Sequence, residues 1–471
     1  MDTLTRGTLL ELEIESLAFG GRGVARTDEG LVVFVEDALP GQRVRARIVR
    51  VKKGHAEAKL SEIVRESPDA VTPRCRHFGT CGGCRLQHLD YPAQLAAKTA
   101  QVSDSLRRLG GFRDPEVRDA LASPDVYGYR NKMEYSFGDR RWLTAGEMAA
   151  GRSHPEDDRA LGLHPRGRWN RILHLEECHL PDELSVKVLR HVQEAVARSS
   201  LDVFTTRTHK GFWRFLVVRE GRRTGQWLVD IITSEEKDGW GEVDELAAGL
   251  VRTFPGLTTV THTLSRSRAA IASGHRTRIL HGEGWIEEEI SGLSFRISPR
   301  AFFQTNTAGA ERLYEEARRQ AGLQGKERVY DVYCGTGTIA LIMAAEAAEV
   351  TGIEMEPAAV VDARANAERN AVSNARFVEG DAAALLRGGP AWGPPDVLVF
   401  DPPRAGLHPD LRAVAPELGA ERIVYISCNP ATLARDLAEI CGNGYLLNVV
   451  QPVDMFPHTP HIECATLLTR R

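Results

Sequence analysis

One cysteine, Cys428, stands in a setting that suits a nucleophile. It lies in Ser427-Cys-Asn-Pro430, after a predicted strand at 422–427 and before a helix expected to begin near Pro430. The N-terminus of a helix favours negative charge, so the thiolate form would be stabilised there. Glu463, at the start of the last predicted strand, is a carboxylate that could accept a proton. The alternative for Cys428 is a buried small hydrophobic residue, as most single cysteines are.

A second segment, Asp401-Pro-Pro-Arg404, follows a predicted strand at 396–400. The prolines restrict its turn, and we expect both segments at the carboxyl edge of one sheet, where ligands bind. A thiolate at this edge could add to C6 of a uracil ring, which turns C5 into an enolate carbon able to accept a methyl group. A base then removes the C5 proton so that the thiol can leave. Cys428 would be the nucleophile and Glu463 the base.

A glycine-containing turn predicts a cofactor site at the same edge. The string Asp331-Val-Tyr-Cys-Gly-Thr-Gly-Thr338 ends one predicted strand, Glu354 ends the next, and Gly380-Asp381 follows the third. Gly335 and Gly337 let the backbone approach a ligand, Glu354 could accept the ribose hydroxyls, and Asp381 could bond an adenine amine. The rest of a dinucleotide fingerprint and a phosphate-binding loop are absent. S-adenosylmethionine is therefore favoured over NAD, although Glu354 could also be only a solvated strand end.

A cluster of cysteines predicts a metal centre elsewhere in the chain. Cys75, Cys81 and Cys84 are separated by five and two residues, with Gly82-Gly83 between the last two. With Cys178 as a fourth thiolate they could hold tetrahedral zinc or an iron–sulfur cluster. The spacing does not choose between the two.

The surrounding pattern predicts an α/β fold. From about residue 325, short apolar strands alternate with helices, which is typical of a doubly wound, Rossmann-like sheet. Residues 8–64 alternate as in a small β-barrel, with Arg43, Arg45 and Arg47 on one strand face. The middle of the chain has a probable helix at 92–109 and strand-like segments, which indicates an α+β region.

Composition limits the class of protein. The chain has 471 residues, a net charge of −4 and 42% hydrophobic residues, so two or three globular domains are expected. Its basic residues gather at 43–59, 207–223 and 266–278, a distribution that favours local docking on RNA phosphates over bulk charge attraction, with solvated surface as the alternative for each stretch. No signal peptide or membrane-spanning run is evident, so a cytoplasmic protein without a membrane partner is expected.

Several of these strings together resemble the bacterial RNA uracil-5 methyltransferases. The resemblance lies in Tyr425–Asp436, Asp401–Arg404, the 331–341 loop, His461-Ile-Glu463 and Pro299–Asn306. It implies Cys428 as the nucleophile and Glu463 as the proton acceptor. It also implies that the cofactor and target base are surrounded by Gln304, Tyr333, Thr338, Glu354, Asp381 and Asp401.

The resemblance extends to the cysteine cluster and to the N-terminal barrel. Members of the family share the Cys-x5-Cys-Gly-Gly-Cys-x2-Gln-His pattern, which Gln87 and His88 complete here. This implies a [4Fe–4S] cluster ligated by Cys75, Cys81, Cys84 and Cys178. The barrel resembles the OB-like TRAM domain, an RNA-binding module. The expected division is a barrel at 1–66, a central iron–sulfur domain at 67–295 and a methyltransferase domain at 296–471.

The expected function is formation of 5-methyluridine, with 23S rRNA as the substrate because family members with both TRAM domain and cluster mostly modify it. The uridine itself is not indicated, and a monomer is expected. A tRNA uracil-5 methyltransferase with the same chemistry is the nearest alternative. A cytosine-5 enzyme is disfavoured because Asp401-Pro-Pro stands where that group has a Pro-Cys motif. A non-catalytic RNA-binding iron–sulfur protein would require a dead site, and the sequence shows no such loss.

Overall fold

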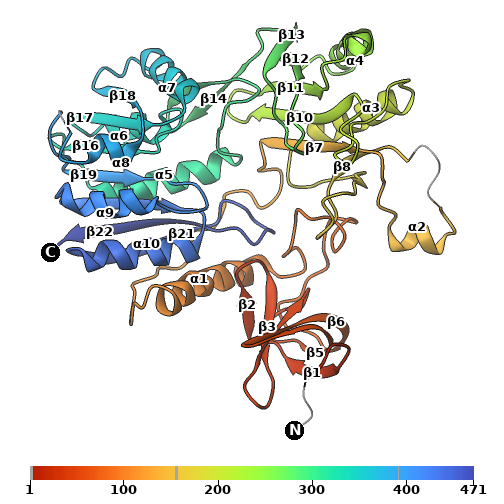
Figure 1. Ribbon diagram of the computed structural model, residues 1–471, viewed down its shortest axis with the longest axis horizontal. Helices are drawn as coiled ribbons and strands as arrows, with labels where there is room; N and C mark the ends of the chain where they lie inside the picture. Colours follow the sequence, from red (N-terminus) through yellow and green to blue (C-terminus); the bar gives the residue numbers. More distant parts are fainter. Residues whose placement is uncertain (1–3, 154–157, 391) are drawn as a thin grey trace.

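The computed structural model describes residues 4–153, 158–390 and 392–471, which fold into three regions that follow one another along the chain (Figure 1). Their strands form a six-stranded sheet, a seven-stranded sheet, a two-stranded hairpin and a second seven-stranded sheet. None of the helices in these ranges is long and apolar enough to cross a lipid bilayer.

The N-terminal region is a sheet in the order β1-β5-β6-β4-β3-β2. Its strands are β1 (Leu9–Glu13), β2 (Ser16–Ala18), β3 (Arg22–Arg26), β4 (Val32–Glu36), β5 (Arg43–Lys52) and β6 (His55–Arg65). Val44, Ala46 and Ile48 of β5 are buried in its core and the arginines between them are exposed, as the alternating sequence predicts.

The exposed arginines of β5 do not form an unpaired basic face. Arg43 lies 2.5 Å from the Glu11 carboxylate on β1, and Arg45 lies 2.9 Å from that of Glu62 on β6. The register sets these pairs, because β1 and β6 flank β5 on its two sides. Cross-strand pairs of opposite charge therefore neutralise much of the face that sequence alone marks as basic.

Helix α1 (Tyr91–Arg108) precedes the central region in sequence but packs on the C-terminal region, where Val102 and Leu106 join the core. The central region is a sheet in the order β13-β12-β11-β10-β7-β8-β9. Its strands are β7 (Lys132–Gly138), β8 (Ala160–Leu163), β9 (Leu173–His174), β10 (Trp213–Gly221), β11 (Gln226–Thr233), β12 (Thr259–Leu264) and β13 (Arg276–His281). Its helices are α2 (Ala145–Ala149), α3 (Glu183–Ala197), the 3-10 turn η1 (Lys237–Gly239) and α4 (Trp240–Thr253).

The second and third basic stretches are also largely occupied by structural roles. Arg214 and Arg219 are each 3% exposed, and Arg219 donates to the Ala301 carbonyl at 2.5 Å. In the third stretch, Arg266 pairs with Glu235 and Arg278 with Asp244. These arginines bind the central sheet to neighbouring segments of the same region and, through Ala301, to the segment before α5.

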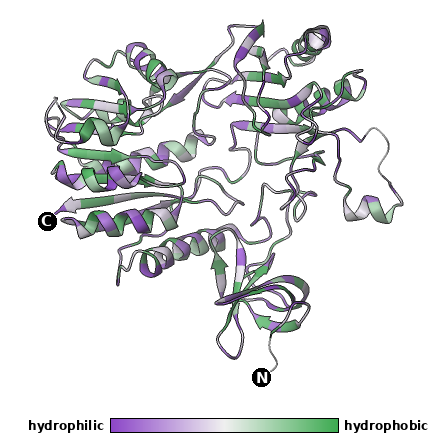
Figure 2. Cartoon of the chain, viewed as in Figure 1, coloured by the Kyte–Doolittle hydropathy of each residue, from purple (hydrophilic) through white to green (hydrophobic). Residues whose placement is uncertain are grey.

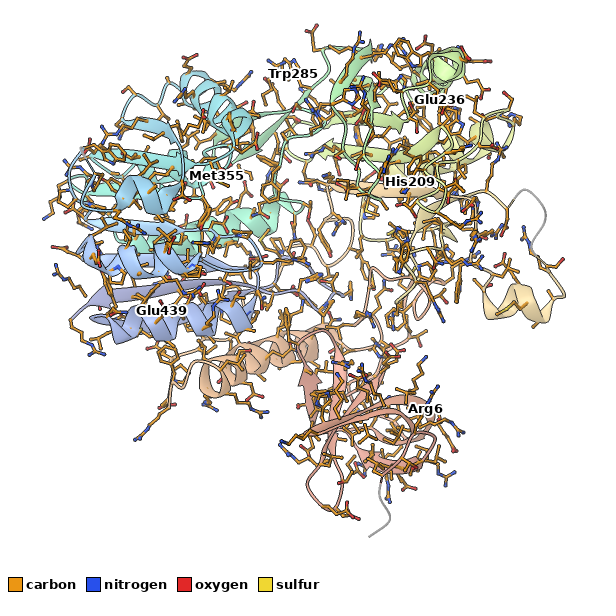
Figure 3. All side chains as sticks on the ribbon, viewed as in Figure 1. Arg6, His209, Glu236, Trp285, Met355 and Glu439 are labelled. Atoms are coloured by element: carbon orange, nitrogen blue, oxygen red, sulfur yellow. The ribbon has the colours of Figure 1, made fainter. Side chains whose placement is uncertain are left out.

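A hairpin of β14 (Ile286–Ile290) and β15 (Leu293–Ile297) joins the central region to the C-terminal one. Trp285, labelled in Figure 3, stands at its start and lies under the guanidinium of Arg296, 4.5 Å from the ring centre. Glu288 is fully buried and accepts hydrogen bonds from the Arg222 and Arg223 amides and from the Thr307 hydroxyl. One carboxylate thus ties the central sheet to the start of the next helix.

The C-terminal region is a doubly wound sheet in the order β18-β17-β16-β19-β20-β22-β21. Its strands are β16 (Arg328–Val332), β17 (Glu349–Glu354), β18 (Ala375–Glu379), β19 (Val397–Phe400), β20 (Arg422–Ser427), β21 (Tyr445–Val453) and β22 (Glu463–Arg470). Its helices are α5 (Thr307–Ala321), α6 (Thr338–Ala344), α7 (Pro357–Arg369), α8 (Ala382–Leu386), α9 (Pro409–Glu417) and α10 (Pro430–Gly442). β16 to β20 are parallel, and β22 runs antiparallel to both β20 and β21.

Figure 2 shows apolar strands in this sheet and helices with mixed faces packed on it. β19 is buried along its whole length, as the continuous run Val397–Phe400 predicts. The strand order changes direction between β16 and β19, and open α/β sheets bind their ligands beyond the carboxyl ends of the strands at such a point. The α/β prediction is confirmed, and the candidate site lies at this carboxyl edge of the sheet.

Candidate active site

The turn after β16 has the backbone that a bound ligand needs. Tyr333, Gly335 and Gly337 all have positive φ, at 68°, 54° and 83°. A β-carbon on Gly337 would lie 2.8 Å from the Phe377 ring, so this glycine allows close packing under the turn. A β-carbon on Gly335 would meet nothing within 4 Å. The turn is therefore packed tightly on one side and open at Gly335.

Two acidic residues, Asp331 and Glu354, lie at the strand ends next to this turn. Asp331 is fully buried and no side chain of the described residues hydrogen-bonds to its carboxyl group. Burial raises its pKa to about 8, with a further rise from Asp401, although the nearby Ala340 amide lowers it. Glu354 accepts hydrogen bonds from the Gly335 amide at 3.0 Å and from the Met355 and Glu356 amides. A positively charged ligand bound nearby would offset the free-energy cost of burying the Asp331 carboxylate.

The other residues predicted around the cofactor lie at the start of α6, at the start of α8 and in the segment before α5. Thr338 begins α6 and is 9% exposed, and exposed Met355 (labelled in Figure 3) follows Glu354. Asp381 caps α8, where one of its oxygens accepts from the Ala384 amide at 2.8 Å. The Gln304 carbonyl accepts from the Asn131 side chain at 3.0 Å, which fixes the segment before α5 against the central region.

Cys428 and Glu463 lie next to each other because β20 ends where its neighbour β22 begins. β20 ends at Ser427 and its antiparallel partner β22 begins at Glu463, with Ser427 opposite Cys464. Cys428 is half-buried and Glu463 is 7% exposed. The helix after Cys428 is capped by Asn429, whose side chain accepts from the Ala431 amide at 3.1 Å. The nucleophile and base predicted from sequence are therefore brought to one point.

Burial controls the ionisation of these groups. It raises the pKa of Cys428 to about 11, Glu463 raises it further, and Arg404 opposes the rise. Burial also raises the pKa of Glu463 well above its ordinary value, and Asp401 adds to this effect. Desolvation of the thiol therefore opposes the stabilisation of its thiolate form that the helix N-terminus supplies.

Two residues outside the predicted set belong to this cluster. Tyr314 on α5 is 4% exposed, and its pKa is raised by burial and by the neighbouring Asp401, Asp331 and Glu463 carboxyl groups. Arg404 faces Cys428 and Glu463 from the loop after β19. Arg404 is visible in the Asp-Pro-Pro-Arg string, whereas no local signal distinguishes Tyr314 from an ordinary helix-core tyrosine.

The segment 454–462 that leads into Glu463 is held by helix α1. Lys98 donates to the Asp454 carboxylate at 2.6 Å and to the Phe456 carbonyl at 3.2 Å, and both members of the ion pair are fully buried. The Gln94 side chain accepts from the His458 amide at 2.9 Å, and His458 stacks on Tyr127 at 4.2 Å between ring centres. Residues more than 300 positions earlier in the chain thus hold in place the segment that precedes Glu463.

The four predicted metal ligands line a second cavity, of about 410 Å³. Cys75, Cys81, Cys84 and Cys178 share its wall with Arg130, Lys132 and Thr459, among others. Burial raises the pKa of Cys84 and of Cys178 to about 12, and nearby thiols add to the rise. As the described side chains lie, no three His, Cys, Asp or Glu residues are grouped so that they could hold a metal ion. Four thiols facing one cavity nevertheless form a donor set that suits iron or zinc.

Comparison with known proteins identifies the family. Residues 395–471 match the family described as tRNA (Uracil-5-)-methyltransferase, residues 3–61 match the TRAM domain and residues 323–392 match a methyltransferase domain. An uncharacterized RNA methyltransferase of Chlorobaculum tepidum is 38% identical over 99% of this chain and 97% of its own length. One from Nitratidesulfovibrio vulgaris is 40% identical over 100% and 98%. The chain belongs to the RNA (uracil-5-)-methyltransferase family.

A solved structure resembles this methyltransferase over nearly its whole length. The tRNA (uracil-54, C5)-methyltransferase of Pyrococcus abyssi, in complex with S-adenosyl-L-homocysteine, has a TM-score of 0.73 and 28% identity. The likeness covers 98% of this chain and 100% of the other. The chain is an S-adenosylmethionine-dependent RNA methyltransferase with an N-terminal TRAM domain, and the class I methyltransferase fold expected for its C-terminal region is confirmed.

If Cys428 is the attacking nucleophile, its raised pKa predicts that methyl transfer becomes faster as the pH rises. With a thiol pKa of about 11, the thiolate fraction increases with pH throughout the neutral range. Glu463 would be needed only after methyl transfer, so its ionisation does not enter this step. Single-turnover methylation should show a slope of about +1 in log rate per pH unit between about pH 7 and 9. A flat profile would mean that RNA binding itself ionises the thiol.

Proposed function

We propose that this methyltransferase forms 5-methyluridine in RNA by covalent catalysis at Cys428. The observation that carries the proposal is the register of β20 and β22, which sets Cys428 beside Glu463 at the carboxyl edge of the sheet. The open turn at Gly335 and the buried Asp331 carboxyl group lie at the same edge. A nucleophile, a base and a loop able to hold a cationic nucleoside at one edge of the sheet are what C5 methylation of a pyrimidine needs.

The chemistry assigned to each residue follows from this arrangement. The Cys428 thiolate adds to C6 of uracil, so that electron density builds at C5. S-adenosylmethionine supplies the methyl group to C5. Glu463 then removes the C5 proton, C5 and C6 regain their double bond, and the Cys428 sulfur leaves as a thiolate. Around the cofactor and the base the proposal places Gln304, Tyr333, Gly335, Gly337, Thr338, Glu354, Asp381 and Asp401.

Replacing Glu463 by glutamine should trap the RNA on the protein. The amide cannot accept the C5 proton, so the methylated adduct forms but Cys428 is not released. A denaturing gel after incubation with RNA and S-adenosylmethionine should show a species shifted by the mass of the RNA. Wild-type protein should show little of it, and the shift should vanish when Cys428→Ala is added to Glu463→Gln. A Glu463→Gln variant that turns over like the wild type would place the base elsewhere.

The proposed substrate is 23S rRNA, on the family resemblance of the combined barrel and cysteine cluster. The whole-chain likeness to a tRNA (uracil-54, C5)-methyltransferase supports tRNA as the second candidate. Radiolabelled methyl transfer to separated 23S rRNA and tRNA, each taken from a strain lacking this protein, tests the choice. Label in rRNA that maps to one 5-methyluridine supports the first candidate, and label in tRNA alone supports the second.

The proposal also assigns a [4Fe–4S] cluster to Cys75, Cys81, Cys84 and Cys178. Its support is the common cavity of the four thiols together with the Gln87-His88 ending of the cysteine pattern. With four protein ligands, such a cluster would hold the surrounding chain segments together. Protein purified without oxygen should be brown and contain about four iron and four sulfide ions per chain. Cys84→Ser should lose the iron and Cys441→Ser should keep it, whereas one bound zinc would refute the cluster.

A further inference from the structure

The loop between β8 and β9 carries an exposed tryptophan. All seven tryptophans of the chain lie in the described ranges, and Trp169, at 73% exposure, is the exposed one among them. Trp213 and Trp227, in contrast, are buried in the central core. A single exposed apolar side chain is common on protein surfaces and shows no partner by itself, but an indole offers a large rigid face on which a partner can stack.

Two arginines without ion pairs flank this tryptophan. The guanidinium groups of Arg168 and Arg171 make no hydrogen bond or salt bridge to any other residue in the described ranges. This distinguishes them from Arg43 and Arg45 of the barrel and from Arg266, all of which are paired with glutamates. The stretch 164–171 thus offers unneutralised positive charge beside an aromatic face.

The base of the loop is firmly anchored although its tip is open. Arg166, whose side chain is 11% exposed, donates to the Cys84 carbonyl at 2.8 Å and forms an ion pair with Asp37 of the barrel. Its guanidinium also lies 5.2 Å from the centre of the Phe78 ring. The Gly82 amide donates to the His164 carbonyl at 2.9 Å, and the His164 ring donates to the Arg171 carbonyl at 3.0 Å. The indole is therefore presented on a fixed support, which limits the entropy lost when it binds a partner.

The anchor also connects the loop to the active site. The cysteine segment that holds Arg166 donates its Arg85 and Leu86 amides to the His458 carbonyl, at 2.8 and 2.9 Å. His458 belongs to the segment 454–462 that leads into Glu463. The tryptophan loop thus stands where the barrel, the cysteine segment and the catalytic region meet.

We infer that Trp169 is a stacking platform for an unpaired base of the RNA substrate, with Arg168 and Arg171 binding the adjacent phosphates. This base is distinct from the target uridine, which we place next to Cys428. Aromatic side chains with neighbouring cations bind single-stranded RNA in this way, since every base has a face that can stack. The inference rests on the proposed function only in taking RNA as the substrate.

The test compares the affinity of full-length protein for a 12-nucleotide oligouridine and for a 12-base-pair RNA duplex, by fluorescence anisotropy. Trp169→Ala should weaken oligouridine binding by roughly 5- to 150-fold and leave duplex binding within about twofold. Trp169→Phe should retain most of the affinity, because phenylalanine can still stack. The double variant Arg168→Ala/Arg171→Ala should weaken both RNAs and lower the salt dependence of binding.

Two variants serve as matched controls. Arg266→Ala removes an exposed but paired arginine, and Leu109→Ala removes another exposed apolar side chain, so neither should change binding appreciably. Equal losses of Trp169→Ala on both RNAs, or a loss below twofold on oligouridine, would overturn the platform. Wild-type protein that binds neither RNA would also reject it, and would leave a protein partner for the loop. A selective loss in Trp169→Ala alongside continued methylation by Cys428→Ala would refute only the proposed chemistry.

Discussion

Replacing Cys428 by alanine is expected to abolish methylation while leaving cofactor binding nearly unchanged. The thiol is half-buried beside Glu463 at the end of β20, and the two other cysteines of the described chain at this edge of the sheet, Cys334 and Cys464, are buried. Without sulfur addition at C6, C5 stays too electron-poor to accept a methyl group. Removal of a covalent nucleophile typically lowers the rate by about 10⁴-fold or more. Tritium transfer from labelled S-adenosylmethionine to RNA measures the loss directly.

A cysteine at the far end of α10 supplies the control for this experiment. Cys441 is buried near the C-terminal end of α10, whereas Cys428 precedes its N-terminal end. The Cys441→Ala variant should therefore keep nearly full activity per folded molecule. Calorimetry with S-adenosylhomocysteine should give similar affinities for both variants and the wild type. Methylation that survives in Cys428→Ala would exclude the covalent route.

The second large effect is expected from Lys98. Replacing it by methionine leaves the Asp454 carboxylate buried without its partner, which costs about 3–5 kcal/mol of stability. Because Asp454 begins the segment that leads into Glu463, methylation should fall together with stability. Urea unfolding followed by far-ultraviolet circular dichroism would measure the change in the free energy of unfolding.

An exposed ion pair on the same helix gives a matched comparison. Arg108 and Asp104 lie 3.2 Å apart on α1 with both side chains more than half exposed, so Arg108→Ala should cost less than about 1 kcal/mol. The double variant Lys98→Met/Asp454→Leu should recover much of the lost stability, because no buried charge remains. A Lys98→Met variant as stable as Arg108→Ala would show that water reaches Asp454.

Much of the catalytic region could be predicted because its signals are local. The strand expected at 422–427 is β20, and the helix expected from Pro430 is α10, since continuous apolar runs and a proline at a helix start have few other interpretations. Once a parallel sheet is predicted, its carboxyl edge gathers the residues after each strand. Cys428 could therefore be predicted at this edge, whereas the antiparallel pairing of β22 with β20 that sets Glu463 beside it was not predicted.

What could not be predicted depends on partners distant in sequence. The prediction that Arg43 and Arg45 share one face of a strand was correct. Their pairing with Glu11 and Glu62 depends on the strand register, which the alternation of side chains along one strand does not determine. The raised pKa of Cys428 was not predicted for the same reason, because it depends on burial in the folded chain and on Glu463 from another strand. Tyr314 joined the site through tertiary packing, without any motif of its own.

The buried contact between Lys98 and Asp454 also has a consequence for the order in which the protein matures. The two residues are 356 positions apart, so their contact cannot form until nearly the whole chain has left the ribosome. A nascent chain that has already completed its barrel and its central sheet still lacks the support behind Glu463. The segment before Glu463 thus gains its support only at the close of synthesis, and a fragment beginning near residue 296 would carry Cys428 and Glu463 without the helix that holds this segment.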